Sequence, residues 1–305
     1  MIKYIVRNII QLIAVCFGII TMVFILTFIA GDPVLMMAPL NATPEEVNAL
    51  RQSLGLNDPL PVQFSRYLLR VIQGDFGNSI RMQQPALRLV IERIPATIEL
   101  GITSLLIATI VGVSVGILSA IKQNTWIDAL GRLLALSGQS IPIFWFGLIL
   151  IILFSVKLRF FPPFGYGEIK ALIMPAVTLA TYNIPLILRL TRSTFLEVIH
   201  QDYVRTAHAK GLPGKIVIFK HILPNAAIPI FTVIGMNFGK IVGGAIVTET
   251  VFAWPGVGLL TIDAIFTADY PIIMACTIIL ASSVVIVNFL TDLIYHVLDP
   301  RIRYS

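Results

Sequence analysis

Two ionisable side chains, Lys240 and Asp292, lie inside long apolar segments of the sequence, where a charge is costly and usually serves a function. Lys240 stands in the middle of its segment. It could place a cation in a pathway through a membrane, facing a carboxylate of a solute or pairing with an acid such as Asp292. It could instead extend its ammonium group toward the membrane surface, or the segment could have other boundaries. Lys240, Asp292 and the helix-bending Pro142 are therefore candidate pathway residues.

No catalytic motif accompanies these residues. The sequence contains no HExxH, no G-x-S-x-G and no pair of aspartates within the apolar segments. Gly214 and Lys215 resemble part of a phosphate-binding loop. However, Ala209 stands in place of the first glycine of such a loop, and Ile216 in place of its Ser/Thr. We therefore expect neither an enzyme active site nor a nucleotide site in this chain.

The elements that position these residues are predicted to be membrane-spanning helices. The chain has 305 residues, of which 57% are hydrophobic and 12% charged, and its mean hydropathy is +0.89, too apolar for a soluble protein. A helix needs roughly 20 apolar residues to cross a bilayer. Cys16 and Cys276 lie within such runs, and we interpret them as small buried hydrophobes without a disulfide. Six runs are long enough: residues 9–30, 96–121, 133–156, 171–190, 226–247 and 272–297.

The distribution of Lys and Arg favours an orientation with both termini in the cytoplasm, because short positively charged loops stay inside. The inner segments then carry more than half of the 22 lysines and arginines. Lys157, Arg159 and Lys170, on a short outer loop, run against the rule, so charge alone leaves the orientation open. The net charge of +6 is interpreted as topology and not as nucleic-acid binding. No imidazole cluster lines a route from outside, which disfavours coordination of bare metal ions, because all four histidines fall on the inner side: His200, His208, His221 and His296.

The outer segment after the first span, residues 31–95, is predicted to be partly helical. Thr43 is a candidate N-cap with Glu46 at the capping-box position, and this helix is expected to stop near Gly55. Residues 62–72 place apolar side chains at helical spacing. The segment could be a cap packed on the outer mouth or part of a surface that meets a delivery protein, and the sequence leaves both open.

Small residues and prolines within the spans predict how the helices pack and bend. Pro142, Pro175 and Pro185 are expected to kink or interrupt the third and fourth spans. Glu99 and Glu249 lie near span ends and are expected at the membrane interface. Glycines at four-residue spacing predict close approach of helix backbones in a packed bundle: Gly112 with Gly116, and Gly235, Gly239 and Gly243 in series.

The loop of residues 202–226, between the fourth and fifth spans, is predicted to be a rigid knob. Residues 203–210 are typical of a short helix, and Gly211 is placed to adopt the left-handed conformation that closes a helix. Residues 215–222 can form a second short helix before the chain enters the fifth span. Such a knob could be gripped by another protein, although many basic loops beside a membrane look similar.

A series of short motifs extends this pattern over nearly the whole chain: Gly31-Asp32-Pro33, Leu54-Gly55-Leu56, Gly74-Asp75-Phe76-Gly77, Pro95 to Leu100, Ser140-Ile141-Pro142, Asp202 to Ala207, Ala209 to Leu212, Asn225-Ala226, Glu249 to Phe252, Trp254 to Gly258, Asp269-Tyr270-Pro271 and Asp299-Pro300-Arg301. In this order and spacing, they make the chain similar to the permeases of the dipeptide, oligopeptide and nickel family of ABC importers. Its 202–226 loop resembles the EAA loop by which such subunits dock onto a separate ATPase.

The resemblance also suggests which loop residues couple the chain to an ATPase. Arg205 stands where other importers have a glutamate, and His221 where isoleucine is common. An arginine there is typical of the peptide branch, and it leaves open whether an ion pair of the glutamate form applies. The implied coupling residues are Tyr203, Arg205, Thr206, Ala207, Lys210, Gly211, Leu212, Leu223 and Pro224.

The implied fold is an all-α membrane protein, a six-helix type I ABC-importer transmembrane domain with a partly helical periplasmic loop after helix 1. Residues 1–95 would form the first helix and that loop, residues 96–298 the core domain with its coupling loop, and residues 299–305 a cytoplasmic tail. The expected location is a bacterial or archaeal plasma membrane.

The implied function is ATP-driven import of small peptides. The implied partners are a second homologous permease subunit, one or two ATPase subunits, a solute-binding protein and the lipid bilayer, with no nucleic acid. ATP and Mg²⁺ would bind the ATPases, and this chain would hold no cofactor or metal. A nickel chelate or a glutathione-like solute fits the same family, because selectivity is expected mainly in the binding protein. A channel or secondary transporter independent of ATP is an alternative of another class, and it would need no docking loop.

Overall fold

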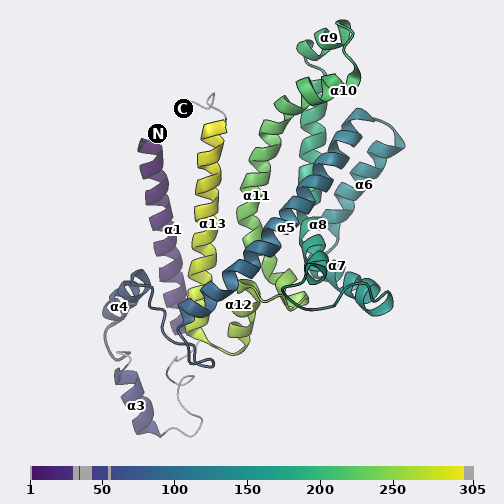
Figure 1. Cartoon of the computed structure of the whole chain (residues 1–305). Coiled ribbons are helices and arrows are strands. Elements are labelled where there is room, and N and C mark those ends of the chain that lie inside the picture. The colour runs from purple at the N-terminus through teal and green to yellow at the C-terminus, as the bar shows by residue number, and fades with distance from the viewer. Residues whose placement is uncertain (1, 30–33, 35–42, 54–55, 299–305) are drawn as a thin grey trace. The chain divides into compact units, whose positions relative to one another are not determined.

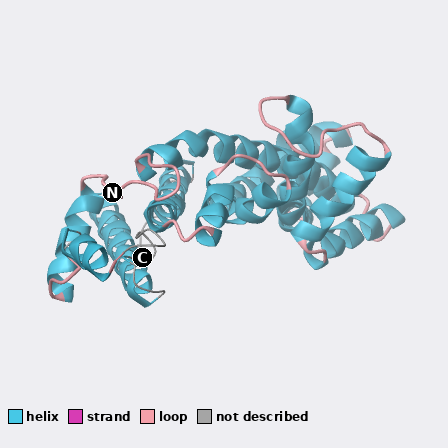
Figure 2. Cartoon of the chain, turned by 90° about the horizontal axis from the view of Figure 1, so that it is seen from below, coloured by secondary structure: helices cyan, strands magenta, loops and turns pink. Residues whose placement is uncertain are grey.

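The chain is built from helices, with one isolated β-bridge between Asn78 and Pro85. The computed structural model describes all residues except 1, 30–33, 35–42, 54–55 and 299–305. Figure 2 shows helices joined by loops, with no strand in this part of the chain. The helices labelled in Figure 1 are α1 (Ile2–Ile29), α3 (Pro44–Ser53), α4 (Leu60–Ile72), α5 (Ala86–Ile121), α6 (Trp126–Ser140), α7 (Ile143–Leu150), α8 (Ile169–Ile199), α9 (Asp202–Ala209), α10 (Gly214–Ile216), α11 (Leu223–Val251), α12 (Val257–Phe266) and α13 (Tyr270–Leu298). Two π-helices, η1 (Ile151–Lys157) and η2 (Val217–Ile222), continue α7 and α10.

The long apolar helices coincide with the predicted spans. α5, α8 and the Tyr270–Phe289 part of α13 are each long and apolar enough to cross a membrane, and α1 contains a shorter apolar stretch, Ile9–Ile25. Two bent pairs each qualify as one broken span, namely Trp126–Gly138 with Ile143–Lys157 and Gly214–Ala227 with Pro229–Gly235. The three helices that qualify by themselves match the predicted second, fourth and sixth spans, and the two bent pairs overlap the third and fifth. The first predicted span overlaps α1.

The third predicted span, residues 133–156, is not one straight helix. The chain bends by 105° between α6 and the α7–η1 helix. Ile141, the residue before Pro142, has an extended backbone (φ −90°, ψ 123°), which the proline ring favours. Pro142 has no N–H with which to continue α6. The prediction that Pro142 interrupts this span is confirmed.

Pro175 and Pro185 do not interrupt the fourth span, because α8 continues through both. α5 likewise runs through Pro95, which the sequence placed at the end of the outer segment. Prolines are tolerated inside membrane helices where neighbouring helices pack on them. Pro185 is buried, and it lies against Gly138 of α6, where a Cβ would come within 2.7 Å of its Cγ. Neither proline interrupts the fourth span, and the kink that the sequence also allowed stays a prediction.

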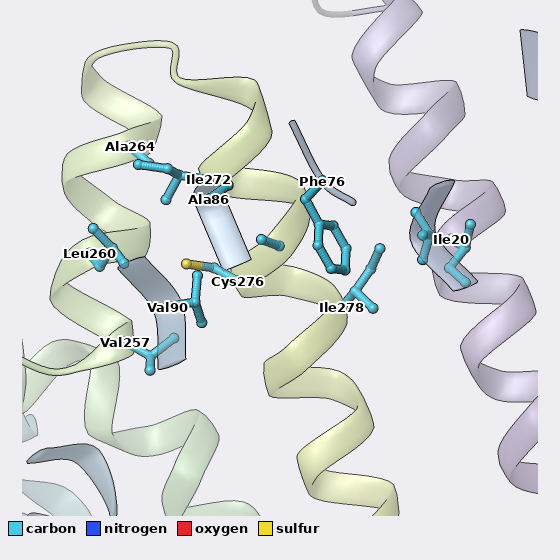
Figure 3. Packing of buried hydrophobic residues seen from close by; sticks show 12 residues of the cluster. Ile20, Phe76, Ala86, Val90, Val257, Leu260, Ala264, Ile272, Cys276 and Ile278 are labelled. Carbon is cyan, nitrogen blue, oxygen red and sulfur yellow. The ribbon is translucent and has the colours of Figure 1, made fainter. Parts of the chain in front are cut away.

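The chain divides into two compact units, which are described separately: Met1–Ala96 with Pro255–Ile286, and Thr97–Trp254 with Val287–Ser305. In the first unit, buried side chains of α5, α12 and α13 form a core together with residues of α1 and α4 (Figure 3). Cys276 is one of these core residues, and its sulfur lies among apolar side chains in Figure 3. Cys16 and Cys276 are both free thiols. Cys276 is buried as expected, whereas Cys16 is only half-buried.

The helix start predicted at Thr43 is confirmed in the first unit. The Glu46 N–H donates to Thr43 Oγ1 over 3.3 Å, and the Thr43 N–H donates to Glu46 Oε2 over 2.8 Å. These reciprocal bonds form a capping box. α3 ends at Ser53. Gly55, where the sequence placed the end of this helix, lies outside the described residues.

α4 packs on α1 through aromatic rings, which confirms the apolar spacing predicted for residues 62–72. The Phe64 ring meets Phe17 and Phe24 edge to face, with ring centroids 5.9 and 5.2 Å apart. Tyr67 stacks on Phe24. Burial raises the pKa of the Tyr67 phenol to about 12, so this side chain stays neutral.

In the second unit, α5 packs closely on α8 through Gly112 and Gly116, as their spacing predicted. A Cβ at either glycine would come within 2.9 and 2.7 Å, respectively, of side-chain atoms of α8. Gly235 of α11 faces Thr291 of α13, where a Cβ would lie 2.7 Å from the threonine Cγ2. The contacts of the other two glycines in the series fall outside the described part of α11: Gly239 and Gly243.

Candidate functional site

α9 and a glycine corner form the first half of the 202–226 loop (Figure 1). Gly211 has φ +75°, the left-handed conformation predicted for it. Its N–H donates to the carbonyl oxygen of His208 over 2.9 Å, and the Leu212 N–H donates to that of Ala207 over 3.4 Å. Both bonds satisfy carbonyl groups that would otherwise lack partners at the end of α9. A Cβ at Gly211 would meet no atom within 4 Å, so the glycine is needed for its backbone conformation alone.

The second half of the loop is one continuous helix. Pro213 precedes α10, which continues as η2 and then as α11. The short helix predicted at residues 215–222 is present, but it does not end before the fifth span. A proline ring clashes with the carbonyl four residues earlier in an α-helix. For Pro224 that residue is Lys220, which lies in the wider turn of η2, and the helix passes through the proline.

One face of the loop is buried against the ends of α5 and α8. Val204 and Ala207 of α9 are 1% and 5% exposed. They belong to a group of buried residues that we call the loop-base cluster: Ala120, Phe195, Val204, Ala207, Val217, Ile222, Ala226 and Ile230. Leu212 and Leu223 pack against this cluster. Three of the predicted coupling residues, Ala207, Leu212 and Leu223, therefore hold the loop in place on the helices beneath it.

The other face of the loop is exposed, and it carries the remaining predicted coupling residues. Arg205 lies 3.6 Å from Asp202, and both side chains are more than 70% exposed, so this ion pair contributes little. Arg205 is therefore available to a partner. The exposed members of the predicted set are Tyr203, Arg205, Thr206, Lys210, Gly211 and Pro224.

The exposed face combines positive charge with apolar area. Lys210, Lys215 and Lys220 are all exposed. Phe219 and Ile216 are 66% and 44% exposed. Exposed aromatic and aliphatic side chains beside basic residues are typical of a protein-binding surface. Sequence reasoning did not single out Phe219, although an aromatic residue in a basic loop was a usable signal.

The three candidate pathway residues lie on or beside three different helices. Lys240 lies on α11 and Asp292 on α13, and their side chains fall outside the described residues. Pro142 precedes α7. An open, largely apolar pocket of about 270 Å³ lies beside the bend at Pro142, between α5, α6, α7 and α8. Its lining includes Val111, Leu134, Ile141, Phe146 and Pro185. Within the described residues, no three His, Cys, Asp or Glu side chains are grouped so as to hold a metal ion.

The structure buries acidic side chains, among them Glu249 and Asp128, that the sequence did not place in the protein interior. Glu249, which the sequence placed near the end of a span, is not exposed, and it accepts a hydrogen bond from Thr97. Asp128 is also fully buried, and it is paired with Arg192. The sequence signal for Asp128 was an acid in the first turn of a helix, which is ordinarily an exposed position.

Two family descriptions together match nearly the whole chain. Residues 1–101 match "Binding-prot-dependent transport system membrane comp, N-term", and residues 112–304 match "Binding-protein-dependent transport system inner membrane component". The chain belongs to this family of transport-system inner membrane components. It is therefore a multi-pass inner-membrane permease subunit of an ABC transporter, and the resemblance derived from its motifs is confirmed.

Curated relatives extend the similarity over the full length of the chain. The permease is 41% identical over 310 residues to the probable peptide ABC transporter permease protein y4tP of Sinorhizobium fredii, with 99% of both chains covered. It is 38% identical over 333 residues to the dipeptide transport system permease protein DppB of Alkalihalophilus pseudofirmus, with both chains fully covered. It is also 38% identical over 306 residues to the glutathione transport system permease protein GsiC of Salmonella typhimurium, again with full coverage.

Solved structures confirm the fold of the permease. A chain of the MetNI methionine ABC transporter matches with a TM-score of 0.59 and 19% identity, covering 72% of the permease and 100% of that chain. A chain of an amino acid ABC transporter matches with a TM-score of 0.52 and 14% identity, covering 70% and 94%. The permease thus has the type I fold of ABC-importer transmembrane subunits, as the sequence predicted.

Proposed function

We propose that this permease translocates dipeptides or oligopeptides that a solute-binding protein delivers to the outer face of the membrane. The observation that carries the proposal is the full-length similarity to permeases named for peptide transport, at 38–41% identity. The arginine at position 205, which the sequence analysis associated with the peptide branch, is exposed and available to a partner.

The 202–226 loop is proposed to be the docking site for a separate ATPase on the cytoplasmic side. Its support is geometric, since a rigid corner at Gly211 presents basic and apolar side chains on one face and is anchored by the loop-base cluster on the other. Both termini are then cytoplasmic. The permease carries no phosphate-binding motif, so ATP and Mg²⁺ bind the ATPase subunits, and the permease itself is not catalytic.

Transport in this proposal proceeds by alternating access. Two ATPase subunits, from one or two genes, close on ATP and move the docking loops of this permease and of a second homologous permease. That movement reorients a pathway between the two permeases, and the solute passes from the binding protein to the cytoplasm. The tight α5–α8 packing at Gly112 and Gly116 supports the transmission of such a movement, because closely packed helices move as one body.

Glutathione is a second candidate solute. Its support is the similarity to the permease named for glutathione transport, which covers both chains completely. Glutathione is itself a short peptide, so the two candidates differ in detail and not in class. A nickel chelate is the third solute that the family allows.

The proposal is tested by reconstitution in proteoliposomes with a second permease, ATPase subunits and a solute-binding protein from the same organism. We expect uptake of a radiolabelled dipeptide that requires both ATP and the binding protein. Uptake that continues without ATP would instead identify a secondary transporter or channel. Uptake of glutathione or of a nickel chelate, with no uptake of dipeptides, would contradict the assignment to dipeptides and oligopeptides.

A further inference from the structure

Asp128 is fully buried at the start of α6, and it accepts two hydrogen bonds from Arg192 of α8. The Arg192 Nε lies 2.7 Å from Asp128 Oδ1, and Nη2 lies 2.9 Å from Oδ2. Two parallel bonds between a guanidinium and a carboxylate restrain distance and orientation together. The pair therefore restrains the start of α6 relative to α8.

The same carboxylate also binds α5 and the turn that follows it. The Ser119 hydroxyl of α5 donates to Asp128 Oδ1, and the backbone N–H of Asn124 donates to Oδ2 over 3.1 Å. Gly131 of α6 lies so near that a Cβ there would come within 3.0 Å of the Ser119 hydroxyl oxygen. Asp128 thus joins three helices, α5, α6 and α8, at one point.

This joint lies directly beside the base of the 202–226 loop. Ala120 follows Ser119 in α5, and Phe195 lies one helical turn beyond Arg192 in α8. Ala120 and Phe195 are both members of the loop-base cluster, into which α9 packs Val204 and Ala207. Figure 1 shows α9 and the α5–α6 turn toward the same end of α8. Packed side chains therefore connect α9 to the joint at Asp128.

At its other end, α6 is also held against α8. Gly138 contacts Pro185 there, and α6 then bends at Pro142 into α7. α6 is thus linked to α8 near both of its ends, by a charge pair at one end and by close packing at the other. Replacing a buried ion pair with apolar residues often preserves stability, so the stability of the fold does not by itself require Asp128 and Arg192 to be charged.

We propose that Asp128 and Arg192 are positioning residues that transmit movement of the 202–226 loop to α6 and to the bend at Pro142. They touch neither the ATPase nor the solute, and their role rests on the proposed docking of the ATPase to this loop. Without the pair, the loop moves while α6 does not follow, so ATP is hydrolysed with little transport.

The test compares variants in the complete transporter, reconstituted in proteoliposomes with its binding protein. Asp128→Asn keeps the side-chain shape and removes the charge. We expect solute transported per ATP hydrolysed to fall roughly tenfold, while ATPase association and ATP hydrolysis remain as in the wild type. Arg192→Lys keeps the charge without the two parallel bonds, and we expect an intermediate ratio. A purely structural role would change the amount of assembled transporter and leave this ratio unaltered.

Two further variants distinguish a loss of coupling from misfolding. The double variant Asp128→Leu/Arg192→Met removes both charges, so it leaves no unpaired buried ion and is expected to assemble while remaining uncoupled. The matched control is the exposed pair Arg88–Glu92, because Arg88→Ala leaves the joint intact and should leave the ratio unchanged.

Each outcome decides between the claims. A normal transport ratio in Asp128→Asn or in the double variant overturns the proposal, and so does a failure of both variants to assemble, which would assign the pair to folding alone. A wild-type transporter without ATP-dependent uptake would refute the proposed function instead, whatever the variants do.

Discussion

The hydroxyl of Thr97 on α5 donates a hydrogen bond to Oε1 of Glu249 on α11 over 2.8 Å. Thr97 is 5% exposed, and Glu249 is not exposed at all. An acidic group in an apolar interior is costly unless hydrogen bonds satisfy it. The threonine therefore helps to hold Glu249 between two helices of the second unit.

Removing this donor is expected to destabilise the permease. Thr97→Val keeps the shape of the side chain but leaves Glu249 with one donor fewer, which should lower the free energy of unfolding by about 1–3 kcal/mol. Thermal unfolding in detergent measures the effect as a lower Tm. Thr97→Ser keeps the hydroxyl and is the control. Equal Tm values for the valine and serine variants would show that the hydrogen bond contributes nothing.

Gly211 should be intolerant of β-branched side chains for reasons of backbone conformation alone. Its φ is +75°, and a Cβ there would meet no neighbouring atom. Left-handed backbone costs an ordinary residue about 1–2 kcal/mol and a β-branched one more. We therefore expect Gly211→Val to abolish ATP-dependent uptake. Pull-down of the ATPase subunit measures its association with the variant, and uptake of labelled peptide measures transport.

Two controls isolate the conformation of Gly211. Gly211→Asn should keep most of the uptake, because asparagine tolerates the left-handed region. Gly214→Ala adds a methyl group three positions after Gly211, where the space is also open but φ is not positive. This variant should leave uptake unchanged. Normal uptake and normal ATPase association in Gly211→Val would exclude the docking role of this corner.

The contact between α5 and α8 at Gly116 should not tolerate even one methyl group. A Cβ at Gly116 would lie 2.7 Å from Thr191 Cβ and 2.8 Å from the carbonyl oxygen of Leu188. Because the second atom belongs to the backbone, the helices must separate, and Gly116→Ala should cost about 1–3 kcal/mol of stability. The Tm in detergent would fall accordingly.

Gly18 of α1 supplies the matched control for Gly116. A Cβ there would meet no atom within 4 Å, so Gly18→Ala should be neutral or slightly stabilising, as alanine is in an open helical position. A Gly116→Ala variant as stable as Gly18→Ala would mean that the close approach of α5 and α8 is not required.

Phe219 is expected to be an anchor for the ATPase. The ring is 66% exposed, and it lies on the same helix as Lys215 and Lys220. Losing one exposed aromatic anchor from an interface typically costs at least about 1 kcal/mol of binding energy, so Phe219→Ala should weaken ATPase binding severalfold without changing the Tm of the permease. Phe266 of α12, which is 85% exposed, is the control, and Phe266→Ala should leave binding unaltered. Equal affinities for both variants would remove Phe219 from the interface.

Lys240 is predicted to act in the pathway and not in docking. Lys240→Met removes the charge with little change in volume, and it should lower peptide uptake while ATPase association stays normal. Lys240→Arg retains the charge and should retain more uptake. Unchanged uptake in the methionine variant would exclude Lys240 from the pathway.

Local features of the fold followed directly from the sequence. Thr43 and Glu46 form the capping box that their three-residue spacing predicted, and Gly211 takes the left-handed conformation expected at the end of a short helix. The Gly112–Gly116 spacing correctly predicted close helix packing. Each of these features depends on neighbours within one or two helical turns, where residue type and spacing are sufficient.

The sequence by itself determined the class of the protein, because long apolar runs require a bilayer and ordered motifs indicate the permease family. Only the tertiary structure decided which charges meet. Asp128 and Arg192 are 64 positions apart, and Thr97 and Glu249 are 152 apart. Tertiary packing also decided that α8 continues through Pro185, because Gly138 of α6 lies against that proline. Hydropathy and spacing report the environment of a segment, whereas the partner of a buried charge or proline depends on how whole helices are placed against one another.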